Sequence, residues 1–304
     1  MKDLFLYVGC TTPVRLSAYE AATKAVLRNL GIELYDMKDA NCCGAQYVES
    51  INRTAFAAMG ARILALAERF EKDILAICGA CSGSLKHNKH LLDTEPDLKA
   101  EVNELLKEED LEYTGKVEVK HLLQVLRDDV GYDAISRAVV QPYNGIRLAA
   151  HYGCHVTRPY DIVQVDDPEV PRVIDDIIEI CGAQAVDYAG KTRCCGGPLL
   201  AMDEDVANVI GREKVDNVKA VGAHGIVTAC VFCNIQLTQV QFGEGSAGRD
   251  RIPVLTLPQF MGAAMGIDED TLGIPLNKIR PTVLLEFMHR IESKALHREQ
   301  EAKR

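Results

Sequence analysis

The sequence predicts an α/β protein made of two pseudo-symmetric repeats, each a small parallel-sheet β/α unit that carries the same CCG cysteine motif. Ten of the eleven cysteines form two sets of five, with the patterns C-x31-CC-x34-C-x2-C and C-x39-CC-x34-C-x2-C. The sequence around these cysteines repeats too. Short apolar segments alternate with segments of helical periodicity, which is typical of parallel α/β units. We expect a first domain at residues 1–145 and a second at 146–304.

The elements of the first repeat follow in order along the chain. LFLYVGC is an apolar strand that ends in Gly-Cys, and SAYEAATKAVLRNLG is an amphipathic helix that Ser17 can cap and that Gly31 ends. GIELYDM is the second strand. DILAICGACSGSL is a buried strand that ends in a CxxC pair and opens into a helix. VEVKHLLQVL is the last step from strand to helix.

Each of these strand segments has a counterpart in the second repeat. The counterparts are, in order, IRLAAHYGC, GAQAVDYAG, GIVTACVFCNIQL and IPVLTLPQFM. The first repeat also contains the polar stretch LLDTEPDLKAEVNELLKEEDLEYTGK, which predicts a surface insertion with one exposed helix. The tail EFMHRIESKALHREQEAKR has the composition of a charged terminal helix that lies in solvent.

Composition excludes several classes of function. The net charge of −10 gives no basic surface for nucleic acid or for an anionic membrane. No window reaches the ~18 apolar residues of a membrane span, so we expect no direct membrane insertion. The start MKDLFLYVGC lacks the layout of a signal peptide, which favours a cytoplasmic protein. In a reducing compartment, eleven cysteines indicate metal binding or redox chemistry rather than a disulfide framework.

The five cysteines of each set are expected to converge on one point, because the carboxyl ends of parallel strands meet at one edge of a sheet. The first cysteine of each set and the first of each CxxC pair follow strands. The adjacent pair lies in a loop, where Gly44 or Gly196 allows a tight turn. The last cysteine of each set starts a helix. Each repeat therefore predicts one thiol-rich site.

Several kinds of site compete for this pattern. A zinc site takes four ligands, which leaves one cysteine of each set unused. A thioredoxin-like dithiol leaves three cysteines unexplained, and covalent haem would need a histidine after the CxxC pair. Inert burial suits Cys181 in IIEICGA, but not ten cysteines in matched spacing. Soft thiolates in loops and at helix starts favour iron–sulfur ligation, and zinc stays as the rival.

With these motifs the chain resembles the heterodisulfide reductase B subunits, a family with a duplicated, cysteine-rich CCG domain, over essentially its whole length. The resemblance implies two noncubane [4Fe-4S] clusters. It assigns one cluster to Cys10, Cys42, Cys43, Cys78 and Cys81, and the other to Cys154, Cys194, Cys195, Cys230 and Cys233.

The implied activity is that of the catalytic component of a methanogenesis enzyme, which reduces the coenzyme M–coenzyme B disulfide to two thiols by one-electron steps. The implied partners within the same complex are a ferredoxin-like subunit together with a flavin-containing one, and a hydrogenase or formate dehydrogenase lies upstream. The alternative within the family is a CCG electron-transfer component of a lactate-, glycolate- or succinate-oxidising complex, or of a thiol:fumarate reductase.

Anionic coenzymes would need cations at the site of an acidic protein. His155, beside Cys154, is the candidate proton donor. The candidate substrate-binding residues are Arg158, Lys86, His87, Lys191 and Arg193. For each of them the alternative is a structural or solvent-exposed role.

Overall fold

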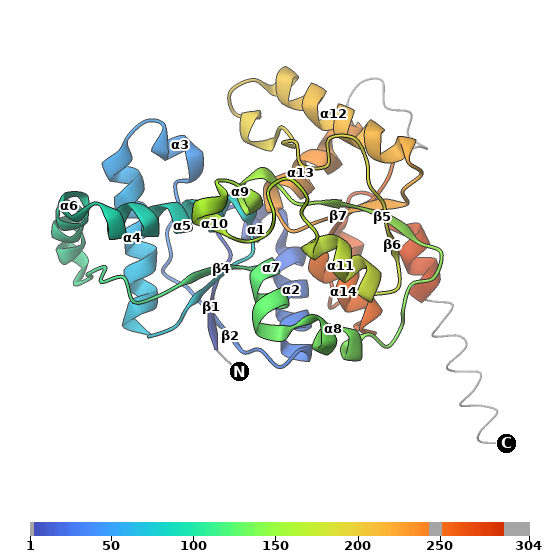
Figure 1. Cartoon of the computed structure of the whole chain (residues 1–304), viewed down its shortest axis with the longest axis horizontal. Helices are drawn as coiled ribbons and strands as arrows, with labels where there is room; N and C mark the ends of the chain where they lie inside the picture. The colour runs from blue at the N-terminus through green and yellow to red at the C-terminus, as the bar shows by residue number, and fades with distance from the viewer. Residues whose placement is uncertain (1–2, 243–250, 289–304) are drawn as a thin grey trace.

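The computed structural model describes residues 3–242 and 251–288, and these form two four-stranded parallel sheets with helices packed around them (Figure 1). The strands of the first sheet, in the order β2-β1-β3-β4, are β1 Leu4–Tyr7, β2 Leu34–Asp36, β3 Ile74–Ala76 and β4 Val119–His121. The second sheet has the order β6-β5-β7-β8, with β5 Arg147–His151, β6 Gln184–Ala185, β7 Gly225–Thr228 and β8 Val254–Thr256. The predicted α/β fold with two pseudo-symmetric repeats is confirmed.

The central strands are buried along their whole length, because helices cover both faces of each sheet. β1 and β3, and β7 in the second sheet, therefore consist of short, largely apolar runs. The strands pair in register, so that their last residues form one row at the carboxyl edge of each sheet. In the first sheet this row is Tyr7, Ala76 and His121, and in the second it is His151, Thr228 and Thr256.

The helices of the first repeat alternate with its strands. They are α1 Thr12–Arg15, α2 Ser17–Asn29, α3 Ala45–Glu49, α4 Arg53–Arg69, α5 Gly79–Thr94, α6 Pro96–Leu106, η1 Lys107–Glu109, α7 Leu122–Gln124, the π-helical η2 Val125–Val130 and α8 Tyr132–Ala138. The predicted cap of α2 is wrong: Ser17 is its first helical residue, and Leu16 holds the N-cap position without a side-chain hydrogen bond. Gly31, at φ +79°, lies just beyond the end of α2, as predicted.

The insertion in the first repeat folds as α6 and η1. Its helix is amphipathic rather than simply exposed: Val102 and Leu106 are buried, and α6 packs against α4. The charged character of the segment describes only its outer face, because apolar residues at helical spacing form the inner one.

The second repeat contains shorter helices. They are α9 Cys154–Thr157, α10 Tyr160–Val163, α11 Val173–Ile180, η3 Gly197–Leu199, α12 Glu204–Ala220, α13 Val231–Gln239, η4 Val240–Phe242, α14 Leu257–Ala264 and η5 Ile274–Leu276. Residues 282–288 are helical, and the rest of the predicted charged tail, 289–304, lies outside the described residues. Within the described ranges, no helix is both long enough and apolar enough to cross a membrane.

The two repeats pack closely against each other. Helix α2 of the first repeat lies on α14 of the second, and α5 lies against α9 and α10 (Figure 1). A Cβ atom built on Gly79 of α5 would come within 2.5 Å of the Val156 side chain, and one on Gly83 within 2.9 Å of the His155 carbonyl oxygen. The helices approach this closely because both positions lack a side chain.

Candidate metal centres

The five thiols of the first repeat form one row at the carboxyl edge of their sheet. The Sγ atom of Cys10 lies 3.6 Å from that of Cys42. Cys43 interacts with Cys42 on one side and with Cys81 on the other. Cys81 in turn interacts with Cys78. The structure thus brings together all five cysteines of the first predicted set.

The second repeat contains the same row. Cys154 interacts with Cys194, and Cys194 interacts with its neighbour Cys195. Cys195 interacts with Cys233, which interacts with Cys230. The row therefore follows the order of the first one, cysteine for cysteine.

The two rows meet where the repeats meet. The Sγ atoms of Cys78 and Cys230 lie 4.0 Å apart, and both residues are buried. At the outer ends, Cys10 is exposed, whereas Cys42, Cys154 and Cys194 are partly exposed. All ten thiols are free of disulfide bonds. They form a continuous array that is closed in the middle and accessible at both ends.

Local structure explains how the backbone holds these sulfurs. Cys81 and Cys233 lie in the first turns of α5 and α13, directly after β3 and β7. Gly9 and Gly153 precede the first cysteine of each set with φ near +72° and +79°. A Cβ on Gly9 would lie only 2.8 Å from the Cys81 Sγ, so the loop after β1 passes too close to this sulfur to carry a side chain.

Hydrogen bonds also stabilise negative charge in the adjacent pair of the second repeat. The backbone amide of Gly196 donates to the Cys194 Sγ at 3.3 Å, and that of Gly197 donates to the Cys195 Sγ at 3.4 Å. Gly196 has φ +86° and Gly44 has φ +75°, and these values confirm the tight turns predicted at both glycines.

The pKa values of the thiols differ along the rows, and some are lowered by their neighbours. Hydrogen bonds from Cys42 and Cys81 lower the pKa of Cys43 to about 4, and those from Cys154 and Cys195 lower the pKa of Cys194 to about 2. Cys230 also has a strongly lowered pKa, because Cys233 and Cys78 donate to it. The thiolate is the form that binds metal, so each row has a ligand ready to coordinate.

These residues fit an iron–sulfur group. The donors are soft sulfurs that are largely shielded from water, each row contains at least one thiol with a lowered pKa, and the glycine loops leave the space beside the sulfurs free of side chains. Cys181, outside both sets, caps the end of α11, and burial raises its pKa to about 12. Its place is consistent with the inert, structural role predicted for it.

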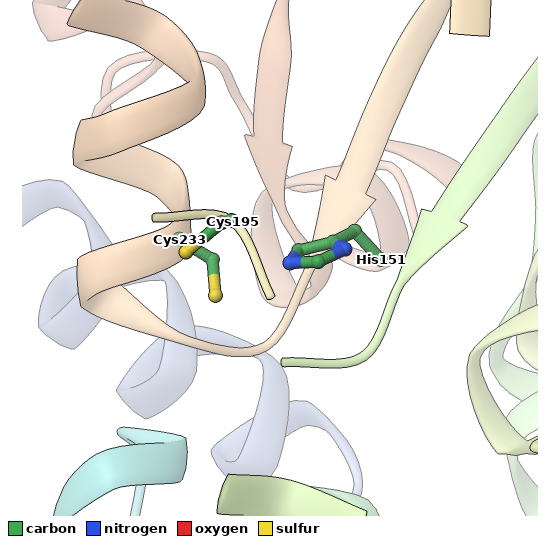
Figure 2. A group of neighbouring side chains, drawn as sticks. All are labelled: His151, Cys195 and Cys233. Atoms are coloured by element: carbon green, nitrogen blue, oxygen red, sulfur yellow. The ribbon is translucent and has the colours of Figure 1, made fainter. Parts of the chain in front are cut away.

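Two residues near the second row were not found from the sequence. His151, the last residue of β5, is fully buried, and a ring nitrogen of His151 with the sulfurs of Cys195 and Cys233 gives three potential ligand atoms within 4.8 Å of one another (Figure 2). Burial, and then the nearby Lys214, lower the pKa of this imidazole well below its ordinary value, against smaller opposing effects. The signal in the sequence was the alignment of the two repeats, which gives His151 the position that Tyr7 holds in the first repeat.

Lys214 on α12 is the second such residue. Its side chain is buried, it donates to the carbonyl of Gly190, and its Nζ lies 5.5 Å from the centre of the Tyr188 ring. Burial lowers the pKa of Lys214 to about 8, and the thiolates of Cys233, Cys195 and Cys194 oppose this shift. Because α12 is polar in its overall composition, nothing in its sequence indicates that Lys214 is buried.

The predicted substrate residues are mostly engaged with other parts of the protein. Lys86 is buried and donates to Gln124 and to the carbonyl of Val163. The Nδ1 atom of His87 lies 2.9 Å from a carboxylate oxygen of Glu49. None of these contacts is with a cysteine.

The candidates around the second adjacent pair differ in accessibility. Lys191 pairs with Asp175 at 2.8 Å and with Asp187 at 2.9 Å. Arg158 donates to the backbone carbonyls of Thr192 and Pro168 at 3.1 and 2.6 Å, and it also pairs with Glu169. Arg193 is the most exposed of the three, and it pairs with Glu213 at 3.2 Å. His155 is partly buried on α9, with its backbone against Gly83.

Comparison with known proteins gives consistent results. The cysteine-rich domain called CCG matches residues 4–86 and 148–238. The chain is 34% identical, over 96% of its length and 97% of theirs, to two relatives. These are the B subunit of the ferredoxin:CoB-CoM heterodisulfide reductase of Methanosarcina mazei and that of the ferredoxin/F(420)H(2)-dependent CoB-CoM heterodisulfide reductase of Methanosarcina acetivorans.

Two further likenesses come from other groups of organisms. The membrane anchor subunit of the 8-methylmenaquinol:fumarate reductase of Wolinella succinogenes is 30% identical, over 93% of this chain and 99% of that protein. A hypothetical protein from Helicobacter pylori, known from its crystal structure, has the same fold, with a TM-score of 0.73 and 18% identity. The match covers 91% of this chain and 51% of that one.

Fold and site together define a duplicated α/β protein in which each repeat brings five free thiols into one row. The chain belongs to the cysteine-rich CCG domain family, among the relatives of the heterodisulfide reductase B subunits.

Proposed function

We propose that this chain is the catalytic iron–sulfur subunit of a heterodisulfide reductase complex, which reduces the coenzyme M–coenzyme B disulfide to two thiols. The observation that carries the proposal is the pair of five-thiol rows that meet at Cys78 and Cys230. The two relatives at 34% identity, which are named as B subunits of such reductases, support it.

Each row would hold one noncubane [4Fe-4S] cluster through its five cysteines. When bound, such a group supplies electrons one at a time. The chain contributes the thiolates, the backbone amides of Gly196 and Gly197 that donate to two of them, and the burial that keeps water from the inner sulfurs. The open outer ends of the rows leave room for exchange with solvent and ligands.

The stoichiometry of the reaction fits a duplicated site. A disulfide takes up two electrons and two protons to give two thiols, and two equivalent metal-binding sets match two one-electron donors. His155 is our candidate for the proton donor. Among the candidate anion contacts, Arg193 is accessible, whereas Lys86 and Lys191 would first have to leave buried protein partners. His87 would have to release one carboxylate, and Arg158 would have to release a carboxylate and two backbone carbonyls.

We further propose that the chain works in the cytoplasm as part of a complex. Its partners would be a ferredoxin-like subunit together with a flavin-containing one, and a hydrogenase or formate dehydrogenase would be the source of electrons. The support is that its relatives are named as subunits of reductases, two of them with ferredoxin in the name.

The alternative is a CCG electron-transfer component of a lactate-, glycolate- or succinate-oxidising complex or of a thiol:fumarate reductase. The relative from Wolinella succinogenes, which is 30% identical and is named as part of a fumarate reductase, favours this interpretation. Reduction of a quinone by the purified complex, without reduction of the disulfide, would decide for it.

The test is to purify the complex anaerobically through a tag on this chain, measure iron and sulfide, and assay reduction of the coenzyme M–coenzyme B disulfide beside simple symmetric disulfides. We expect iron in both repeats and preference for the mixed disulfide. The variants Cys78→Ala and Cys230→Ala should each lose iron, whereas Cys181→Ala, outside both rows, should keep it. A colourless chain with zinc and no iron would contradict the proposal.

A further inference from the structure

The two thiol rows differ in the residue that ends the first strand of each sheet. In the first repeat this residue is Tyr7, and in the second it is His151. The hydroxyl of Tyr7 donates to the backbone carbonyl of Asn41 at 2.9 Å, so its polar atom has a partner. His151 is completely buried, and neither of its ring nitrogens has a hydrogen-bond partner of good geometry among the described residues. The backbone of Lys191 has only a minor effect on the pKa of this ring.

The position of this buried imidazole needs an explanation. A buried polar group without a partner costs about 1–3 kcal/mol, and such groups are rare in native structures. The hydroxyl of Thr228, which pairs with His151 in the register of β5 and β7, is also buried and unpartnered among the described residues. Within the described part of the chain, two neighbouring polar side chains therefore lack partners at the same edge of the second sheet.

This edge faces the second thiol row. Figure 2 shows the His151 ring with one nitrogen turned toward Cys195 and Cys233, and these ligand atoms lie within 4.8 Å of one another. Helix α13 begins here and places Cys233 in its first turn, while Gly153 leaves space beside that sulfur, since a Cβ there would lie 3.3 Å from it. The imidazole thus points at the place that the proposed iron–sulfur group would fill.

We propose that His151 donates an N–H hydrogen bond to a sulfur of the iron–sulfur group held by the second cysteine set, and thereby raises the reduction potential of that group above that of the first. The inference rests on the proposed function. Reduction adds negative charge to the group, so an N–H dipole aimed at its sulfurs stabilises the reduced form more than the oxidised one. The second set would then be the one that electrons occupy first.

A buried cation acts in the same direction. Lys214 interacts with the thiolates of Cys233, Cys195 and Cys194, so its charge also favours the reduced group. In the first repeat, the Tyr7 hydroxyl at the matching position is already bonded to Asn41. Pseudo-symmetric ligand sets with different surroundings would give two sites of unequal potential.

The experiment compares three variants of the anaerobically purified, iron-loaded complex by redox titration followed with electron paramagnetic resonance. His151→Leu removes the donor, His151→Gln keeps an N–H, and Tyr7→Phe is the matched change in the first repeat. We expect two distinct potentials in the wild-type protein. His151→Leu should lower the higher one by at least a tenfold change in the equilibrium constant, about 59 mV for one electron.

His151→Gln should restore most of that shift, and Tyr7→Phe should leave the higher potential unchanged. In protein labelled with ¹⁵N-histidine, a weak nitrogen coupling to the reduced group should be present and should vanish in His151→Gln. Unchanged potentials in an iron-loaded His151→Leu variant would overturn the inference, and so would a strong coupling typical of direct nitrogen ligation or no coupling at all. Wild-type protein that contains no iron would instead contradict the proposed function.

Discussion

Single residues that are not cysteines decide whether the thiols can converge. Gly9 adopts φ +72°, and a Cβ on it would lie 2.8 Å from the Cys81 sulfur. Two demands therefore meet at this position: a left-handed backbone and free space beside a ligand atom. Gly153 serves the second row in the same way, with slightly more room.

A substitution at Gly9 separates these two demands. Gly9→Ala should destabilise the protein and also lower the iron content of the first set, because the new methyl group would displace Cys81. Gly145→Ala is the control, since Gly145 has φ +76° but open space around its Cβ position. It should cost about 1–2 kcal/mol of unfolding free energy from backbone strain alone and keep its iron. Urea unfolding and iron analysis of both variants would measure this; equal iron in both would contradict it.

At the scale of elements, α5 and α13 begin at the CxxC pairs and hold equivalent positions in the two repeats, but they have different neighbours. Gly79 and Gly83 of α5 let α9 approach closely, whereas the matching positions of α13 are Val231 and Ile235. A pocket of about 290 Å³ lies beside α13, lined in part by Val14 of α1 and by Ile235. The pseudo-symmetry is thus broken at the contact between repeats.

The close contact between α5 and α9 predicts that a Gly→Ala substitution changes stability in the direction opposite to the usual one. In an ordinary helix interior, Gly→Ala stabilises a protein by about 1 kcal/mol. Gly83→Ala should instead destabilise this one, by about 1–3 kcal/mol, because the methyl group would lie 2.9 Å from the His155 carbonyl oxygen and force α9 away. The midpoint of urea unfolding measures the effect. A variant as stable as the parent would show that α9 adjusts freely.

In the whole molecule, Lys86 joins the two repeats. It extends from α5 of the first repeat and donates to the carbonyl of Val163, at the end of α10 in the second. It also donates to Gln124 of α7. Burial lowers the pKa of Lys86 to about 8 from its ordinary value of 10.5, with smaller contributions from Glu118 and Arg127.

This lowered pKa predicts a pH dependence of stability. Between about pH 8 and 10.5 the unfolded chain holds the Lys86 proton and the folded chain does not, so stability should rise with pH across this window. The gain should be on the order of 3 kcal/mol at most. Because thiols titrate in the same range, the measured quantity is the difference between the parent and Lys86→Met. A difference that stays flat from pH 8 to 10.5 would contradict the prediction.

The sequence predicted much of the fold and of the thiol sites. Cysteine spacing located the two sets, and strand and helix patterns placed each cysteine at a strand end, in a loop or at a helix start. Local patterns failed where the partner of a residue is distant in sequence. Nothing in the local pattern indicated that Lys86, a candidate substrate contact, is hydrogen-bonded to Val163 of the second repeat. The insertion helix was expected to be exposed, but it buries Val102 and Leu106.

The sequence by itself determined that there are two repeats, that each is an α/β unit, and which five cysteines belong to each, because these properties depend on spacing and periodicity along the chain. Only the tertiary structure decided how the two sets are related and what surrounds them. The approach of Cys78 to Cys230 and that of the buried His151 imidazole to Cys195 bring together elements far apart in sequence. Packing fixes such contacts, and packing depends on the shapes of both partners at once.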